Sequence, residues 1–388
     1  MLELWQRELD ALLKQDPVRC AERMRARFDE VAGPQGRSLV LFGAGPLGRK
    51  TLQGLRTLGI EPLAFADNNS ALWNQSVEGL LVLAPNEAVK RFCNRAVFVV
   101  TVFNGFMVRQ QLQALGCPRV VPFALLYWKH AEIFLPYGGL DWPQKIHDNA
   151  EDVRKMLSLW GDDVSRGEYL AQLQWRTTLD SAYLPTPLPA SQTYFPSDLT
   201  GLGKDEVFVD CGAFDGDSVR SFMERSGASF RQIVALEPDP GNCANLQRYV
   251  STLAPEIRAR ISVRQCAVGA RREKVRFVAT GTAGSGVNQA GSIEAECLPL
   301  DELRADVTPT YLKMDIEGAE GAALQGARRT IEKNSAVWAV CLYHQQEHLW
   351  QLPLMMASFS SGYRFFLRRY AEDCWELVCY AVPMGRCR

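Results

Sequence analysis

The stretch that most constrains this chain is residues 207–218, which read Val-Phe-Val-Asp-Cys-Gly-Ala-Phe-Asp-Gly-Asp-Ser. Its first half is typical of a buried β-strand, and its end carries the acids and the serine that are favoured at the start of a helix. Gly212 and Gly216 allow the backbone of the turn to approach a ligand closely. The sequence therefore predicts a strand, a ligand-binding turn and a helix.

This turn carries much negative charge, because it holds Asp210, Asp215 and Asp217. A phosphate-binding turn avoids carboxylates, since its ligand is already anionic. A second apolar run at residues 233–236 is followed by Glu237, and an acid at the end of the second strand of a doubly wound sheet binds ribose hydroxyls. S-adenosylmethionine combines a sulfonium, an ammonium and a ribose, so the pattern favours it as the ligand. An ordinary strand-to-helix turn is the alternative for the turn taken alone.

A third run, Leu-Lys-Met-Asp-Ile-Glu-Gly-Ala-Glu at residues 312–320, is charged where a buried strand should be apolar. With the turn at 210–216, the Leu-Glu-Pro at 236–238 and the Gly-Ala at 326–327, it resembles the FkbM family of S-adenosylmethionine-dependent methyltransferases. The Lys-x-Asp-x-Glu-Gly-x-Glu pattern is the specific part of this resemblance. The chain departs from the family at Phe214, where Asn is common.

The resemblance covers roughly residues 180 to 385 and implies a Rossmann-like class I methyltransferase fold. This α/β fold has a seven-stranded, mostly parallel sheet with a C-terminal antiparallel hairpin. The sequence predicts strands that alternate with helices at 207–210, 233–237, 261–266, 311–316 and 337–343. Two further strands, at 363–368 and 375–382, follow without a helix between them. The family further implies O-methylation of a hydroxyl on a sugar, a polysaccharide precursor or a polyketide-type acceptor.

The expected cofactor site combines the acidic turn, the acid after the second strand and the ends of two further strands. Cys266 and Ala267 end the third strand, beside the adenine in this fold, although plain strand packing explains them equally well. The expected cofactor-binding residues are Asp210, Gly212, Ala213, Asp215, Gly216, Asp217, Glu237, Cys266, Ala267 and Asp315. The glycine-rich segment 281–287 suits a lid, with an ordinary hairpin loop slightly favoured.

A hydroxyl acceptor must also lose its proton, and ligands of open α/β sheets bind at the carboxyl ends of the strands. His344 and Asp315 follow predicted strands there, and His344 titrates near neutral pH. The predicted catalytic residues are therefore His344, Asp315 and Glu317. A helix-capping histidine and a buried pair between Lys313 and Asp315 are the structural alternatives. No metal is required by the pattern, although Asp315 with Glu317 could hold one.

A second glycine turn lies near the N-terminus, where Gly43, Gly45 and Gly48 follow an apolar run in the order Gly-x-Gly-x-x-Gly. Asp67 ends the next apolar run, 19 residues after Gly48, which is close to the spacing of a dinucleotide-binding fold. The sequence predicts a smaller Rossmann-like domain in which these four residues bind a nucleotide or a nucleotide-sugar. A purely structural or assembly role is the alternative, and an NAD-dependent oxidoreductase is a weaker one, since no hydride-transfer domain follows.

Four segments are expected along the chain. They are an N-terminal helical segment at 1–36, a Rossmann-like domain at 37–128, a helical and extended connector and cap at 129–205, and the methyltransferase domain at 206–388. Apolar residues at helical spacing in the first segment predict a helix that packs on the first domain, and contact between two copies of a homodimer is the minority interpretation.

Charge and cysteine usage limit the partners. A formal net charge of −1 gives no general attraction to nucleic acid or to an anionic membrane. The sequence has no run of about 18 apolar residues, so no membrane span is expected. The 11 cysteines are scattered without a Cys-x-x-Cys pair, which indicates reduced thiols in the cytoplasm. The main alternative to an enzyme is a non-catalytic nucleotide- or nucleotide-sugar-binding scaffold that retains the fold.

Overall fold

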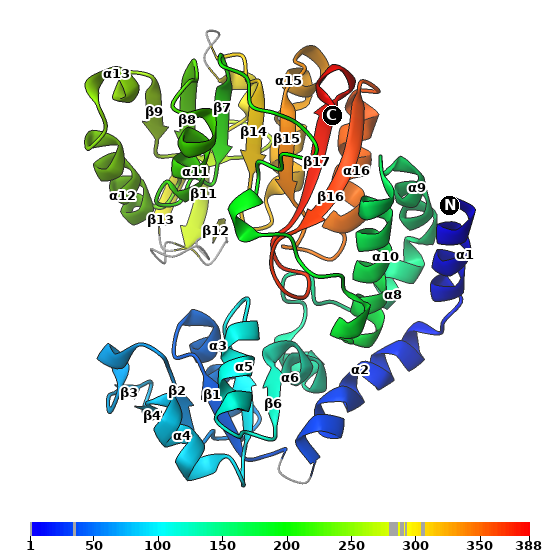
Figure 1. Cartoon of the computed structure of the whole chain (residues 1–388), viewed down its shortest axis with the longest axis vertical. Helices are drawn as coiled ribbons and strands as arrows, with labels where there is room; N and C mark the ends of the chain where they lie inside the picture. The colour runs from blue at the N-terminus through cyan, green and yellow to red at the C-terminus, as the bar shows by residue number, and fades with distance from the viewer. Residues whose placement is uncertain (1, 34–35, 279–285, 288–290, 292, 304–306) are drawn as a thin grey trace.

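The computed structural model describes residues 2–33, 36–278, 286–287, 291, 293–303 and 307–388. Two lobes, each built on its own β-sheet, lie one above the other and are joined along one side by helices (Figure 1). None of the described helices is both long enough and apolar enough to cross a membrane. Most of the glycine-rich segment at 281–287, interpreted as a hairpin loop or a lid, lies outside the described residues, since 281–285 are not described.

The N-terminal sheet has six strands in the order β3-β4-β2-β1-β5-β6, and only β3 runs antiparallel to its neighbour. Its strands are β1 (Leu39–Phe42), β2 (Ala64–Ala66), β3 (Ser76–Val77), β4 (Leu80–Leu83), β5 (Val97–Val100) and β6 (Val120–Pro122). The neighbouring helices are α3 (Pro46–Thr57), α4 (Pro85–Phe92), α5 (Phe106–Ala114) and α6 (Phe123–Lys129). The predicted Rossmann-like architecture of this lobe is confirmed.

The C-terminal sheet has seven strands in the order β16-β17-β15-β14-β7-β8-β9. Only β17 runs antiparallel to its neighbours, which confirms the predicted mostly parallel sheet with a C-terminal hairpin. The strands are β7 (Val207–Cys211), β8 (Gln232–Leu236), β9 (Ile261–Arg264), β14 (Tyr311–Met314), β15 (Val337–Cys341), β16 (Tyr363–Arg369) and β17 (Leu377–Pro383). The helices are α11 (Asp217–Ser226), α12 (Pro240–Ser251), α13 (Pro255–Arg258), α14 (Glu320–Gln325), α15 (Arg328–Lys333) and α16 (His348–Phe359).

A small third sheet, which the sequence reading did not anticipate, lies beside the C-terminal sheet. It has the order β10-β13-β11-β12. Its strands are β10 (Ala267–Val268), β11 (Glu273–Val278), β12 (Gly286–Val287) and β13 (Ile293–Leu298). The strand expected at 261–266 therefore ends at Arg264, and Ala267 pairs instead with Cys297 of β13.

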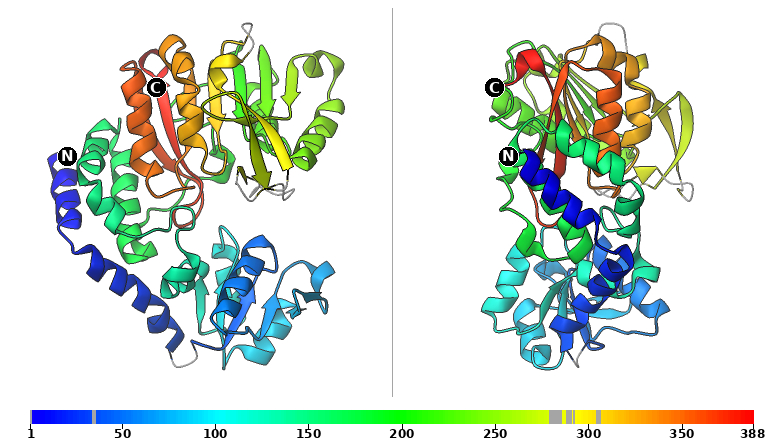
Figure 2. Two further views of the ribbon diagram at one scale, coloured as in Figure 1. Left: turned by 180° about the vertical axis from the view of Figure 1, so that it is seen from behind. Right: turned by 90° about the vertical axis from the view of Figure 1, so that its right-hand side faces the viewer.

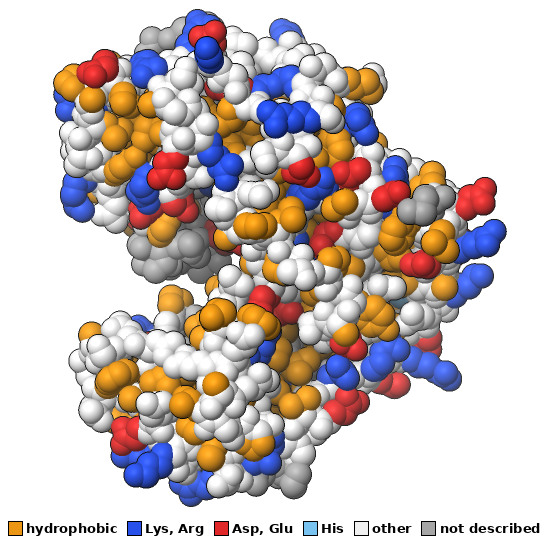
Figure 3. Space-filling view, in the orientation of Figure 1, with side chains coloured by type: hydrophobic (Ala, Val, Ile, Leu, Met, Phe, Trp, Pro, Cys, Tyr) orange, Lys and Arg blue, Asp and Glu red, His pale blue; other side chains and the backbone are white. Residues whose placement is uncertain are grey.

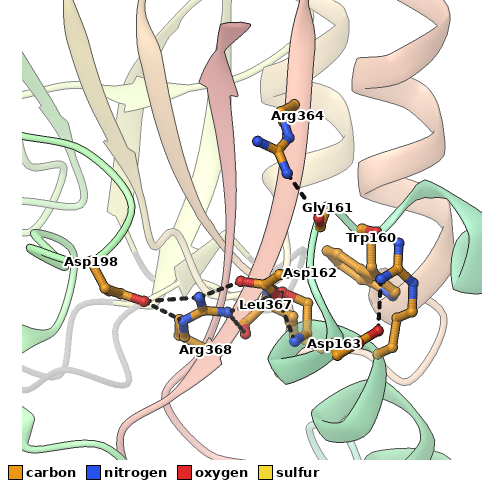
Figure 4. Close-up of polar contacts among 10 residues, drawn as sticks. Trp160, Gly161, Asp162, Asp163, Asp198, Arg364, Leu367 and Arg368 are labelled. Carbon is orange, nitrogen blue, oxygen red and sulfur yellow. Dashed lines mark hydrogen bonds and ion pairs between the residues drawn. The ribbon is translucent and has the colours of Figure 1, made fainter. Parts of the chain in front are cut away.

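The connector carries helices α7 (Ala131–Phe134), α8 (Gln144–Asp148), α9 (Ala150–Leu159) and α10 (Asp163–Thr178). It is tied to edge strand β16 through Arg368, a buried side chain that donates to Asp162 Oδ2 at 2.7 Å and to Asp198 Oδ2 at 2.8 Å (Figure 4). Arg364 of the same strand donates to the Gly161 carbonyl at 2.9 Å. These bonds attach the helical layer to the C-terminal sheet, and the views in Figure 2 show the connector helices next to the C-terminal lobe.

The N-terminal segment forms two helices that divide between the lobes. Leu9 and Leu12 of α1 (Leu2–Leu13) are buried in the core of the C-terminal lobe, next to α9 and α10. Met24 and Phe28 of α2 (Pro17–Ala32) are buried in the core of the N-terminal lobe. The expected packing on the first domain therefore holds for α2 and is wrong for α1, because the apolar periodicity of a helix does not say which apolar surface covers it.

The loop between β16 and β17 reaches the N-terminal lobe. The ring of Trp375 packs edge-on against Phe103, with centroids 4.8 Å apart, and also contacts Tyr137. Arg109 of α5 donates to both carboxylate oxygens of Glu372, at 3.0 and 3.1 Å. The C-terminal hairpin therefore contributes directly to the contact between the two lobes.

Candidate active site

A cavity of about 1250 Å³ lies between the two lobes, and Figure 3 shows the surface hollowed there. The C-terminal lobe contributes Gly212, Phe214, Asp217, Glu237, Cys266, Ala267, Lys313, Asp315, Glu317, Tyr343, His344 and Glu376 to its wall. The connector and the N-terminal lobe contribute Ser191, Thr193, Tyr194, Gly45, Lys50, Thr101, Asn104 and Tyr137. One cavity is therefore shared by both glycine turns.

The turn after β7 requires its glycine at Gly212. This residue has a φ of +81°, and a Cβ atom there would lie 1.9 Å from the carbonyl oxygen of Asp315. Phe214 also has a left-handed φ, of +48°. Asn tolerates that region better than most residues, which gives a physical reason for the Asn that the family commonly has at this position.

Glu237 is held rigidly against the turn. Its Oε2 accepts from the amide of Phe214 at 2.8 Å, and its Oε1 accepts from the amide of Asp239 at 2.9 Å. Burial raises the pKa of Glu237 to about 6, although these amide donors favour the charged form. The carboxylate therefore lies in a fixed position at the cavity wall, as a ribose-binding acid would.

The acids of the turn do not all face the cavity. Asp210 is fully buried, lies 3.2 Å from the amine of Lys313, and accepts a hydrogen bond from the hydroxyl of Ser218. Asp215 forms an ion pair with Arg220 at 2.6 Å. Among the acids of the turn, only Asp217 lines the cavity.

Of the other predicted cofactor residues, too, some line the cavity and some do not. Ala213 and Gly216, like Asp210 and Asp215, are not part of the cavity wall, whereas Cys266 and Ala267 are buried in it. Burial raises the pKa of the Cys266 thiol to about 12, so this cysteine packs as a small apolar group and is not a nucleophile.

Asp315 is held by two tyrosines. Its Oδ2 accepts from the hydroxyl of Tyr194 at 2.7 Å, and its Oδ1 accepts from the hydroxyl of Tyr343 at 3.1 Å. Burial alone would raise the pKa of Asp315, but the positive charges of Lys313 and His344 and these hydrogen bonds lower it. Sequence reasoning did not identify Tyr194, because it lies in the connector and reaches Asp315 only in the folded chain.

His344 stands among three carboxylates. Its Nδ1 lies 2.7 Å from Glu320 Oε1, and its Nε2 lies 3.3 Å from Asp315 Oδ1 and 3.9 Å from Glu317 Oε1. Burial disfavours the imidazolium, but the carboxylates outweigh it and raise the pKa of His344 to about 10. The cluster thus keeps an excess of negative charge even when the ring is protonated.

Two acids of this region are not among the predicted site residues. Glu320 is the fully buried partner of the imidazole. Glu376 was not singled out, and it reaches the cavity wall from the loop before β17. Burial, with Asp315 nearby, raises the pKa of Glu376 to about 7, and burial likewise raises that of Glu317 to about 7. Nothing in the local sequence around Glu376 indicates this placement.

The N-terminal turn repeats the arrangement of the C-terminal one. Asp67 Oδ2 accepts from the amide of Ala44 at 2.8 Å, as Glu237 does from Phe214. Gly45 lines the cavity, whereas Gly43, Gly48 and Asp67 do not. Gly48 is needed for packing, because a Cβ atom there would lie 1.8 Å from the carbonyl oxygen of Gly43.

The chain is similar in sequence and in structure to known methyltransferases. The model of the methyltransferase FkbM domain matches residues 210–369. The crystal structure of methyltransferase FkbM from Methylobacillus flagellatus KT is similar over 98% of both chains, with 24% identity and a TM-score of 0.72. A putative rRNA methylase from Clostridium thermocellum matches 47% of this chain and 88% of its own, with 10% identity and a TM-score of 0.30. No curated protein sequence matches the chain.

Proposed function

Because residues 210–369 belong to the methyltransferase FkbM family, we propose that the chain transfers the methyl group of S-adenosylmethionine to a hydroxyl group. The proposed acceptor is a sugar, a polysaccharide precursor or a polyketide-type molecule. The observation that carries the proposal is the fixed carboxylate of Glu237 beside the Gly212 turn, at the wall of a cavity large enough for cofactor and acceptor together.

The proposed cofactor position follows from this wall. The ribose hydroxyls donate to Glu237, the adenine lies against Cys266 and Ala267, and the positively charged methionine end lies near Asp217 and Asp315. Asp315 follows β14, whose neighbour in the sheet is β7, the strand that leads into the turn. An acid at this place favours a sulfonium, because opposite charges attract strongly in a partly buried site.

The proposed reaction is an in-line displacement. The carbon–sulfur bond breaks as the acceptor oxygen bonds to the methyl carbon, S-adenosylhomocysteine leaves, and the hydroxyl proton passes to a protein group. We assign that proton to His344 or, failing it, to Asp315, with Glu317 beside them. Because the neighbouring carboxylates raise the pKa of His344 to about 10, only its neutral form, a minor species at neutral pH, can accept the proton, whereas the lowered pKa of Asp315 keeps that carboxylate charged. The meeting of these three side chains at one part of the cavity wall supports the assignment.

The N-terminal lobe is proposed to bind the nucleotide part of a nucleotide-sugar. Gly45, at the N-terminus of α3, lines the shared cavity together with Lys50 and Thr101. A helix N-terminus and a lysine favour an anionic group. The 11 cysteines are all free thiols, which supports the cytoplasmic location expected from the sequence.

Calorimetric titration with S-adenosylmethionine tests this function. Wild type should bind it, and a wild-type protein that does not bind it would overturn the proposal. His344→Asn should keep this affinity nearly intact, because the proposed role of the ring is toward the acceptor and not toward the cofactor. Its turnover with a panel of nucleotide-sugars should fall by about 10²- to 10⁴-fold. A histidine that only supports the fold would instead lower the melting temperature.

A further inference from the structure

We infer that Asp315, Glu317 and His344 form a binding site for one divalent transition-metal cation, of the Mn²⁺ or Zn²⁺ class, at the wall of the cavity. The site would bind the acceptor hydroxyl, and this role rests on the proposed function, whereas the cation site itself does not. The ligands would be Asp315 Oδ1, Glu317 Oε1 and His344 Nε2.

The distances between these atoms suit a common ion. Ligand atoms about 2.1 Å from one metal lie roughly 3.0 Å apart at right angles and roughly 4.2 Å apart on opposite sides. His344 Nε2 lies 3.3 Å from Asp315 Oδ1 and 3.9 Å from Glu317 Oε1, between these limits. His344 Nε2 is therefore spaced from each of the two carboxylate oxygens as two ligands of one cation would be, and the exposed Glu317 side chain, 35% accessible, has room to move toward Asp315.

The imidazole is already oriented for such a role. Its Nδ1 is 2.7 Å from the fully buried Glu320, while its Nε2 is buried and forms no hydrogen bond within the described residues. The His344 side chain is 7% exposed and lines the cavity. A carboxylate behind the second ring nitrogen is the usual support of a metal-binding histidine. Glu320 is thus a positioning residue and not a ligand, because one imidazole cannot direct both nitrogens at the same ion.

The carboxylate ligand is supported in the same way. Tyr194 and Tyr343 donate to the two oxygens of Asp315, at 2.7 and 3.1 Å, and fix its plane. An imidazole with two carboxylates suits Mn²⁺ or Zn²⁺ better than Mg²⁺, which prefers oxygen ligands. Three protein ligands leave coordination positions free for the acceptor hydroxyl, so His344 Nε2 would act as a ligand in place of a proton acceptor.

Binding of Mn²⁺ alone to the full chain, after treatment with a chelator, tests the site by calorimetry and electron paramagnetic resonance. Wild type should bind one Mn²⁺. Asp315→Asn and His344→Asn should each weaken that binding at least about tenfold, and Glu320→Gln about tenfold through loss of ring orientation. Glu237→Gln is the matched control in the same cavity, and it should bind Mn²⁺ like wild type while binding S-adenosylmethionine more weakly.

Pulsed electron paramagnetic resonance of the wild-type complex adds a readout that needs no variant, since it should show coupling of Mn²⁺ to one imidazole nitrogen. Absence of that coupling, absence of Mn²⁺ and Zn²⁺ binding by wild type, or wild-type affinity in both His344→Asn and Asp315→Asn would overturn the inference. Wild type that binds S-adenosylmethionine but no cation would leave the proposed function standing with His344 as the base. Failure to bind S-adenosylmethionine would overturn the proposed function alone.

Discussion

The amine of Lys313 lies 3.2 Å from Asp210 Oδ1, and both side chains are buried beneath the Gly212 turn, which we propose binds the cofactor. The same amine donates to the carbonyl oxygen of Gly212 at 2.5 Å. These two contacts connect strand β14 to strand β7 and to the turn that follows it. Lys313 therefore supports the shape of the turn from below, although it also reaches the cavity wall.

Lys313→Met should lower the free energy of unfolding by about 3–5 kcal/mol, because it leaves the charge of Asp210 buried without a partner. Denaturation by urea measures this loss. Lys313→Met combined with Asp210→Asn should recover part of it. Arg328→Met, which breaks an exposed pair with Glu332, should change stability by no more than about 1 kcal/mol. Equal stability of Lys313→Met and wild type would show that the buried pair does not stabilise the fold.

Glu237→Gln should weaken the binding of S-adenosylmethionine by about 1.5–3 kcal/mol, the size of a lost hydrogen bond to a charged group. The melting temperature of the free protein and calorimetric titration together separate this effect from misfolding. Glu224→Gln, a change of the same kind on the exposed face of α11, should leave the affinity unchanged. Wild-type affinity in Glu237→Gln would remove this acid from the cofactor site.

The affinity for S-adenosylmethionine should also depend on pH through Glu237. Burial raises the pKa of this carboxyl to about 6. The group is therefore charged above pH 6, where it accepts hydrogen bonds from the ribose hydroxyls in the proposed complex, and it becomes neutral below that pH. Affinity should therefore fall as the pH is lowered from 7 to 5, by at most about tenfold per pH unit. The same titration series on Glu237→Gln should lose this slope and keep only the dependence of Glu317 and Glu376, whose pKa values lie near 7. A parallel slope in both proteins would assign the whole dependence to groups other than Glu237.

The N-terminal turn can be tested with two substitutions that act differently. Gly45→Val adds a side chain where no atom lies within 4 Å of a Cβ position, so it should obstruct the cavity without disturbing the fold. Asp67→Ala removes the acceptor for the Ala44 amide and should loosen the turn. Both should reduce the thermal shift that nucleotide-sugars produce. If both variants keep every such shift of the wild type, the N-terminal lobe has a structural role.

The local features of the sequence determined the two glycine turns and most strands of both large sheets. The strand-turn-helix units at Gly43 and Gly212 were readable, because a continuous apolar run and the special φ of glycine are properties of a few consecutive residues. The antiparallel hairpin at the C-terminus was readable for the same reason. Strands β3, β4 and β6 and the four strands of the small third sheet were not predicted. Of these, β3, β10 and β12 have two residues each, and so short a run carries no periodicity.

The tertiary structure alone decided which side chains meet. Asp210 lies in strand β7 and Asp217 is the first residue of helix α11, so one faces Lys313 inside the sheet and the other lines the cavity, because the turn between them changes the direction of the chain. Tyr194 reaches Asp315 over 121 residues of sequence, and Glu320 reaches His344 over 24. Such contacts depend on strand order and on how the connector packs across the sheet edge, and no local pattern in the sequence encodes either.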